Sequence, residues 1–392
     1  MARFTTRSVW LVLFFAGRPS HIRATDPSTI SASSLANLYQ LFTSSTLSFP
    51  STTLSQPSTV SYVQSSWLLA NNLVESGQTD MLFVESPNYA VGMKRDERAL
   101  NDEEASSAST SSRKTSTTTK STSTVNAKAL SATTTTTMTG TTSLPTPAVL
   151  QITYPANSYS HQTGGAEFYS LPFGSTTQYT TMLLTYEVAF PPNFNWVQGG
   201  KLPGLRGGPD RVGCSGGAQP DGSDCFSVRL MWRPGGAGEV YAYIPTTPAF
   251  CSQSEIICNS DYGVSIQRGA FHFSPNTWQT ISLLVQLNDP SAANGLVELY
   301  VNNHLAISQP GLVFRTNESI ASIGGMFFST FFGGSDPSWA TPTQQYTYYR
   351  NVELRAGTPS NNNGNGGTSV IGSTWLELVA LLTTIVLGIF MF

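Results

Sequence analysis

An arginine and two tyrosines lie close together in RLMWRPGGAGEVYAYIP, the segment of residues 229–245. The pattern predicts two antiparallel strands joined by a turn at the Pro-Gly-Gly sequence. Because side chains alternate between the faces of a strand, Arg229 lies on the polar face of the first strand, and Tyr241 and Tyr243 lie on that of the second. A guanidinium group holds an anion, and a phenol near cations accepts or donates a proton. These residues predict a face for acid–base chemistry on an anionic ligand.

The pairing of these two strands decides which side chains meet. A turn over residues 234–237, with the pairing centred on Gly236, places Arg229 opposite Tyr243. Ser227 shares the face of Arg229. An ordinary interpretation stays open, because exposed tyrosines are common on strands and an arginine readily stacks on one.

Lys201, in NWVQGGKLPGLRGG, is the single lysine of residues 150–356. This region holds nine cationic residues, eight arginines and Lys201, against thirteen acidic ones, six aspartates and seven glutamates. A lone ammonium group in a net-acidic region, framed by glycine and proline, indicates a selected position, although chance also explains one lysine. The formal net charge of the whole chain is −3 without a basic block, so the electrostatic footprint of a nucleic-acid-binding protein is absent.

Short strands must position these residues. Between residues 148 and 357 the chain contains β-branched or aromatic runs separated by Gly, Pro and Asn, such as TMLLTYEVAF, CFSVRLMW, TWQTISLLVQLN and QYTYYRNVELR. Many short strands at this spacing predict an all-β domain built as a sandwich, barrel or jelly roll. The phenylalanines of MFFSTFFGG are expected in its core rather than on a sugar-stacking platform.

The two ends of the chain indicate an exported and anchored protein. Basic residues followed by a short apolar run are typical of a signal peptide, here over residues 1–24. A polar spacer, residues 358–374, precedes the apolar residues 375–392. This pattern predicts a GPI-anchor signal, with a membrane-anchoring tail helix as the alternative. We therefore expect a secreted protein at the cell surface or in the cell wall.

Two segments precede the predicted domain. Residues 105–147 are almost all Ser, Thr and Ala, which predicts a disordered, O-glycosylated linker. Residues 25–104 have no role that the sequence assigns. Within them, Lys94-Arg95 is either a dibasic processing point or part of a solvated charge run.

All four cysteines fall within one window of 45 residues and allow three disulfide connectivities. An extracellular location favours disulfides, and short loops beside strands favour Cys214–Cys225 and Cys251–Cys258. A zinc site is the rival, but the spacings do not fit the usual zinc motifs and no histidine lies between the cysteines. The sequon at Asn317 predicts a glycan on a surface turn.

Several segments together resemble the polysaccharide lyase family 14 domain. They are GGKLPGL, the SVRL and YAYIP pair, VQLND followed by NG, and FFSTFFGGSDPSWATP, within about 200 residues. The resemblance implies a concanavalin-like β-jelly-roll whose groove binds an acidic polysaccharide of the alginate or glucuronan type and cleaves it by β-elimination. It also implies a disulfide closing the loop from Cys214 to Cys225. Arg206, after KLPGL, departs from the expected pattern.

The resemblance assigns site positions to Lys201, Ser227, Arg229, Tyr241 and Tyr243. Elimination needs cations for the developing negative charge, a base, and an acid for the leaving oxygen. Lys201 and Arg229 are the expected cations, and Ser227 adds a hydrogen bond to the substrate. Tyr243 is expected as base and acid while Tyr241 positions the substrate, and the reverse assignment stays open. No cofactor or metal is implied.

Other polar residues support smaller hypotheses. Gln286 and Asn288 share one face of LLVQLN and are expected to bind sugar hydroxyls, unless Asn288 only begins a turn. His161 is an alternative base, and no Ser-His-Asp arrangement is apparent. Hydrolysis would need two carboxylates, whereas Glu239 is the only acidic side chain expected on this face. A monomeric lyase is the leading hypothesis, and a non-catalytic carbohydrate-binding wall protein is the alternative.

Overall fold

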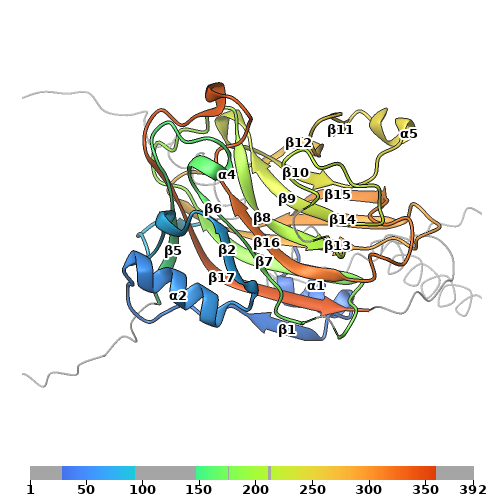
Figure 1. The fold of residues 1–392 in the computed structure, drawn as a ribbon, viewed down its shortest axis with the longest axis horizontal. Coiled ribbons are helices and arrows are strands. Elements are labelled where there is room, and N and C mark those ends of the chain that lie inside the picture. Colours follow the sequence, from blue (N-terminus) through green and yellow to red (C-terminus); the bar gives the residue numbers. More distant parts are fainter. Residues whose placement is uncertain (1–28, 93–146, 175, 211–212, 359–392) are drawn as a thin grey trace, which may run out of the picture.

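Two β-sheets packed face to face form the protein in a computed structural model that describes residues 29–92, 147–174, 176–210 and 213–358 (Figure 1). The first sheet, sheet A, runs in the order β15 (His304–Leu312), β14 (Gly295–Val301), β13 (Thr277–Gln286), β7 (Thr181–Ala189), β17 (Gln345–Gly357), β5 (Val149–Tyr154) and β3 (Met81–Val84). At its margins β1 (Thr43–Thr46) pairs with β17, and β4 (Ala90–Val91) pairs with β13.

The second sheet, sheet B, runs in the order β11 (Ile256–Ile257), β12 (Val264–His272), β10 (Ala237–Tyr243), β9 (Phe226–Trp232), β8 (Gly200–Gly207), β16 (Ile323–Thr330), β6 (Ala166–Ser170) and β2 (Leu69–Ser76). The α-helices are α1 (Ala32–Leu38), α2 (Gln56–Ser66), α4 (Ser160–Thr163) and α5 (Pro248–Cys251). The described residues also form the 3-10 turns η1 (Gln78–Asp80), η2 (Pro234–Gly236) and η3 (Pro337–Trp339). The predicted all-β sandwich is confirmed.

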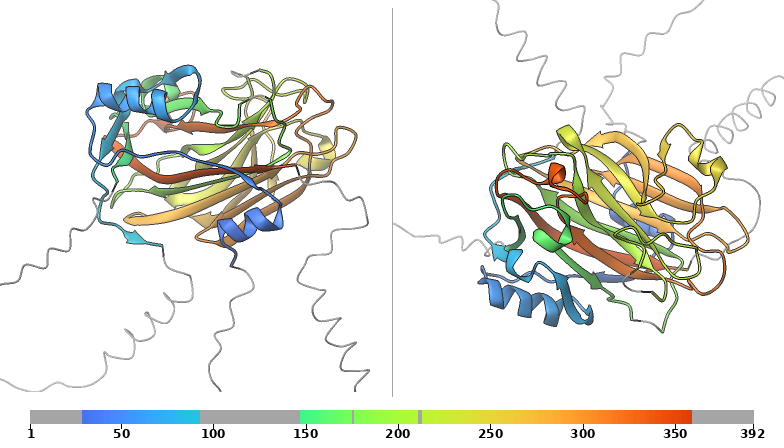
Figure 2. Two further views of the ribbon diagram at one scale, coloured as in Figure 1. Left: turned by 90° about the horizontal axis from the view of Figure 1, so that it is seen from below. Right: turned by 45° about the horizontal axis from the view of Figure 1, so that its top comes forward.

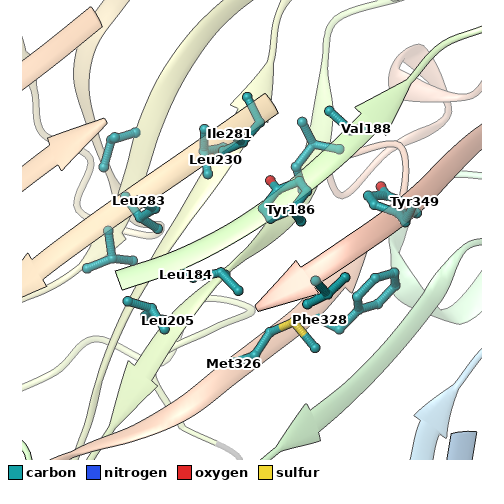
Figure 3. Close-up of a cluster of buried hydrophobic side chains, with 14 of the residues drawn as sticks. Leu184, Tyr186, Val188, Leu205, Leu230, Ile281, Leu283, Met326, Phe328 and Tyr349 are labelled. Carbon is teal, nitrogen blue, oxygen red and sulfur yellow. The ribbon is translucent and has the colours of Figure 1, made fainter. Parts of the chain in front are cut away.

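The core lies between the two sheets (Figure 3). Side chains of β7, β13 and β17 in sheet A face those of β8, β9 and β16 in sheet B. Leu184 and Tyr186 from sheet A and Leu230 and Phe328 from sheet B are each no more than 1% exposed. Phe328 and Phe332 of MFFSTFFGG belong to this core, as predicted, whereas Phe327 packs against Tyr169 in a separate cluster and Phe331 lines a cavity. Inward-facing apolar residues on alternate strand positions therefore hold the sandwich together.

Residues 29–92 are part of the sandwich, which corrects the predicted domain boundary at residue 148. Strand β2 pairs with β6 in sheet B, whereas β3 pairs with β5 and β1 with β17 in sheet A. In Figure 2 the blue helix α2 lies at one end of the molecule and the yellow helix α5 at the other. Strands β1, β3 and β4 have only four, four and two residues, so their local patterns are too short to predict pairing with residues 65 to 313 positions away.

The other predicted segments fall largely where the structure gives no description. The signal peptide, the Ser/Thr-rich linker, the spacer and the terminal apolar run lie outside the described residues, except for positions 147 and 358. Among the helices of the described ranges, none has the length and apolar character needed to cross a bilayer. Asn317 lies exposed in a turn between β15 and β16.

Replacing Trp67 with alanine should lower the free energy of unfolding by about 3–5 kcal/mol. Trp67 is fully buried, its ring contacts Phe49 and Phe168, and its Nε1 donates a hydrogen bond of 2.7 Å to Ser48 O. Its loss leaves a cavity at the junction of the N-terminal segment with both sheets. Thermal and denaturant unfolding measure the effect. Phe42→Ala, at a side chain 78% exposed in the same segment, is the control and should change stability little. Equal stability of both variants would contradict an integral N-terminal segment.

Candidate active site

The predicted alternation of faces in β9 and β10 is confirmed. Val228 and Leu230 point into the core between the sheets, whereas Arg229 lines a cavity on the outer face of sheet B. Tyr241 and Tyr243 line the same cavity. The β-strand period of two therefore brings the guanidinium group and both phenols to one surface.

The predicted register between these strands is wrong. Arg229 pairs with Tyr241 rather than Tyr243. The pairing is centred on Gly235, which has a φ of +69°, and not on Gly236. Moving the turn centre by one residue shifts every partner by two positions, which leaves the faces unchanged. Both phenols still lie near the guanidinium group, since Arg229 Cζ is 5.8 Å from the centroid of the Tyr243 ring.

Lys201 reaches the same surface from β8, the neighbour of β9. Its Nζ lies 3.5 Å from the centroid of the Tyr241 ring and 2.8 Å from Met231 Sδ. Its side chain is buried at the cavity wall. Burial, and then the guanidinium groups of Arg229 and Arg233, lower the pKa of Lys201 well below its ordinary value. The ammonium group is thus held where a negative ligand would stabilise its charge.

Arg229 is buried, with 1% of its surface exposed. Its Nη1 donates a hydrogen bond of 3.1 Å to Ser329 Oγ, and its guanidinium plane packs 4.5 Å from the centroid of Phe327. Nε and Nη2 have no hydrogen-bond partner within the described chain. Buried donors without partners are costly, and they are found where a ligand supplies the missing acceptor.

Each phenol accepts a backbone hydrogen bond from a neighbouring loop. Gly217 N donates to Tyr243 Oη at 3.0 Å, and Gly263 N donates to Tyr241 Oη at 2.9 Å. The rings meet edge to face, with their centroids 5.8 Å apart. Burial, and then the neighbouring Tyr243, raise the pKa of Tyr241. Arg229 acts in the opposite direction, but burial outweighs its influence. Tyr241 therefore stays protonated at neutral pH.

Both predicted disulfides, Cys214–Cys225 and Cys251–Cys258, are present. All four cysteine sulfurs are thus joined in two disulfide pairs, which contradicts the zinc alternative. The first disulfide closes the loop that carries Gly217, and the second lies a few residues before Gly263. The first disulfide therefore restrains the loop that holds Tyr243, whereas Gly263 lies outside the loop that the second one closes.

Ser227 does not face the cavity, which corrects its assignment to substrate binding. The side chain is 1% exposed, and its Oγ donates a hydrogen bond of 2.6 Å to Cys214 O. Because Cys214 begins the loop that carries Gly217, Ser227 positions that loop under Tyr243. The type and face of this residue were predictable, but the loop that folds over it was not.

The cavity has a volume of about 550 Å³ and includes residues that sequence reasoning missed. Besides Lys201 and Arg229, it is lined by two further basic residues, the carboxylate of Glu167, and aromatic side chains. The missed lining residues include Glu167, Arg233, Arg268, Tyr159, Tyr262 and Trp339. His161, predicted as an alternative base, also lines it, next to the ring of Phe331. These residues come from loops and from strands distant in sequence.

A sequence model of the polysaccharide lyase 14 family matches residues 142–352. The chain belongs to this family. As a member of polysaccharide lyase family 14, it is a carbon–oxygen lyase that acts on polysaccharides, and the resemblance predicted from the sequence is confirmed. No curated protein matches the chain.

Among solved structures, this polysaccharide lyase 14 chain is similar to an alginate lyase of the same family from Aplysia kurodai, with 41% identity and a TM-score of 0.50. That match covers 54% of this chain and 84% of the other. The chain also resembles alginate lyase Aly36B, at 24% identity and a TM-score of 0.44, over 54% of this chain and 82% of that one. A further match is alginate lyase vAL-1 from a Chlorella virus, at 22% identity and a TM-score of 0.44, over 54% and 85%.

Gln286 and Asn288 are not brought to the site of this lyase, which corrects their expected role. Gln286 ends β13 in sheet A, and neither residue lines the cavity on sheet B. Asn288 is fully buried, and its Oδ1 accepts hydrogen bonds from Phe314 N at 2.8 Å and Arg315 N at 3.1 Å. Its amide fixes a chain corner, in keeping with the alternative of a turn residue.

In this polysaccharide lyase, Gly263→Ala should lower kcat about 10- to 100-fold. A Cβ at Gly263 would lie 2.8 Å from Ala242 O and 2.9 Å from ring carbons of both Tyr241 and Tyr243, so the backbone of β10 and the phenols must shift. Steady-state kinetics measure the effect. Gly324→Ala is the control, because its Cβ would meet neighbours at no less than 3.6 Å. An unchanged kcat in Gly263→Ala would show that the positions of the phenols do not matter.

Proposed function

We propose that the protein cleaves a 4-linked uronic acid polymer of the alginate type by β-elimination, at the cavity on sheet B. The main support is that Nε and Nη2 of the buried Arg229 guanidinium group have no hydrogen-bond partner among the described residues. Lys201 and both phenols line the same cavity. A carboxylate is the acceptor that suits a paired arginine and lysine. The alginate lyase from Aplysia kurodai, at 41% identity, supports the substrate class.

The reaction begins with removal of the proton at C5 of the uronate. The electron pair of the C5–H bond becomes the C4–C5 double bond, the C4–O bond breaks, and the leaving oxygen takes up a proton. Negative charge spreads onto the carboxylate as the C5 proton departs, so donors aimed at that group lower the barrier. Arg229 and Lys201 supply these donors.

The two phenols divide the proton transfers. Both phenols have a backbone donor for a phenolate, and Tyr243 is the proposed base because the raised pKa of Tyr241 disfavours a phenolate there. Tyr241 is the proposed acid, because its raised pKa keeps its proton available for the leaving oxygen. Glu239 takes no part, because two arginines and Ser265 occupy both of its oxygens.

The uronate carboxylate also sets the charge of Lys201. Burial and neighbouring arginines lower the pKa of Lys201 in the free protein, and a bound anion raises it again. Binding of the substrate is therefore coupled to uptake of a proton by this side chain.

The location of the protein is a further part of the proposal. We infer secretion through residues 1–24, a GPI anchor attached in place of residues 375–392, a glycan on Asn317, and action as a monomer at the cell surface or wall. The two disulfides and the exposed Asn317 support an extracellular site. Release of the protein from intact cells by a phosphatidylinositol-specific phospholipase C supports the GPI anchor, whereas retention favours a tail helix.

A substrate panel tests the activity. The full chain is incubated with polymannuronate, polyguluronate, polyglucuronate and neutral cellulose oligomers, while the ultraviolet absorbance of an unsaturated uronate is recorded. We expect absorbance to rise with one or more of the uronate polymers and not with the neutral control. Binding of uronate polymers without any absorbance change would instead favour a non-catalytic carbohydrate-binding protein.

A further inference from the structure

A second basic group lies beside the proposed catalytic residues. Glu239 is fully buried on β10, and its Oε1 accepts hydrogen bonds from Arg233 Nε at 2.9 Å and Nη2 at 2.5 Å. Its Oε2 accepts from Arg268 Nε at 2.7 Å and from Ser265 Oγ at 2.6 Å. One carboxylate thus holds two guanidinium groups, and the three side chains together carry a net charge of one positive unit.

A bulge in β12 brings Arg268 to this position. Val240 pairs with Ile266 and Gly238 with Phe271, so four residues of β12 lie opposite Glu239 alone. Within the bulge Gln267 has a φ of +50°, a conformation that costs energy for a residue other than glycine. Gln267 is fixed by its Nε2, which donates to Ser308 O at 2.9 Å. Bulges beside active sites commonly redirect one side chain.

The end of the Arg268 side chain is available to a ligand. Its Nε is occupied by Glu239 and Ser265, but Nη1 and Nη2 make no hydrogen bond to the described part of the chain. The side chain is 39% exposed and lines the same cavity as Lys201 and Arg229. Arg233 is less accessible, at 12%, and its Cζ lies 5.9 Å from the centroid of the Trp339 ring. Of Arg233, Glu239 and Arg268, Arg268 is therefore the side chain that can donate two hydrogen bonds to an anion.

We propose that Arg268, oriented by Glu239, binds the carboxylate of a second uronate residue next to the one held by Arg229 and Lys201. This inference rests on the proposed function and deepens it. A net positive trio fits a second negative charge on the same polymer. Binding at Arg268 fixes the register of the polymer, and it makes cleavage depend on consecutive uronate units instead of a single one.

Kinetics with uronate oligosaccharides of increasing length test the proposal in the full chain. The smallest cleavable oligomer leaves one subsite unfilled, whereas longer ones fill both. For Arg268→Gln we expect KM for the longer oligomers to rise about tenfold while kcat changes little, so that the advantage of length disappears. Arg268→Lys keeps the charge but not the two-pronged geometry and should recover only part of the affinity. Arg350→Gln is the control, since it breaks an arginine–glutamate pair of 2.7 Å in sheet A.

Two results would overturn the second subsite. One is an unchanged KM for long oligomers in Arg268→Gln. The other is a fall of kcat for oligomers of every length. That result would mean that Arg268 acts only by holding Glu239 in place and does not bind the substrate. Calorimetric binding to a Tyr243→Phe background separates this inference from the lyase activity. If wild-type protein cleaves no uronate polymer, the proposed function fails. The subsite is still supported if adding Arg268→Gln weakens binding of oligouronates but not of their carboxyl-reduced forms. Equal binding of oligouronates with and without Arg268→Gln refutes it.

Discussion

Replacing Tyr243 with phenylalanine should reduce kcat about a thousandfold while substrate affinity changes little. The substitution removes the one atom, Oη, that is proposed to take the C5 proton. The ring remains to pack against Tyr241 and Arg229. Gly217 N loses its acceptor, so thermal unfolding is measured in parallel to show that the fold is kept. A variant that retains a tenth or more of wild-type turnover would exclude Tyr243 as the base.

A substrate that needs no acid distinguishes the roles of the two phenols. In a uronate with fluoride at C4, the leaving group departs without protonation. If Tyr241 is only the acid, Tyr241→Phe regains turnover on this compound, whereas Tyr243→Phe stays inactive. If Tyr243 serves as both base and acid, Tyr241→Phe shows no selective recovery. Reversed behaviour of the two variants would assign Tyr241 as the base, against the raised pKa of its phenol.

Replacing Lys201 with methionine should lower kcat/KM about 100- to 1,000-fold and at the same time raise the melting temperature. The activity falls because a donor to the developing carboxylate charge is lost. Stability rises because methionine has a similar length and needs no charge in a buried site. Such opposed effects are typical of a residue retained for function at a cost to the fold. Lys201→Arg keeps the charge and serves as the matched comparison for activity.

The pH dependence of this stability gain has a defined sign. The pKa of Lys201 is lowered in the folded protein from its ordinary value of 10.5. Between these two values the unfolded chain binds a proton that the folded protein does not, so wild-type stability rises with pH. The advantage of Lys201→Met is therefore largest below the folded pKa and shrinks toward pH 10.5. Melting temperatures at pH 7 and pH 10 measure it. A gain that is constant with pH would mean that burial of charge is not its cause.

The local sequence predicted which side chains of β9 and β10 share a face better than it predicted how the two strands pair. The alternation in SVRLMW and EVYAYIP was sufficient to place Arg229, Tyr241 and Tyr243 on one face, because the strand period is independent of register. The register itself depended on whether Gly235 or Gly236 centred the turn, and both glycines tolerate the positive φ required there. A choice between two adjacent glycines cannot be made from local composition.

Residues outside one hairpin were predicted less well, since the sheet that a strand joins is a non-local property. Gln286 lies on a strand as predicted, but β13 belongs to sheet A, on the other side of the core. Arg268 was missed because its position depends on a bulge, and Glu167 because β6 reaches sheet B beside β16. The N-terminal strands were missed for the same reason. Their partners are chosen by contacts that form only when the whole sandwich closes.

The pairing of β1 with β17 has a consequence for biosynthesis. Thr46 lies opposite Glu353, so one of the earliest strands made has one of the last as its partner. At about 5–20 residues per second, a ribosome adds the intervening chain in about 15–60 s. During that time the edges that β1 needs do not exist, and unpaired strands readily join other chains. The nascent N-terminal segment therefore needs protection from other chains until β17 has been made.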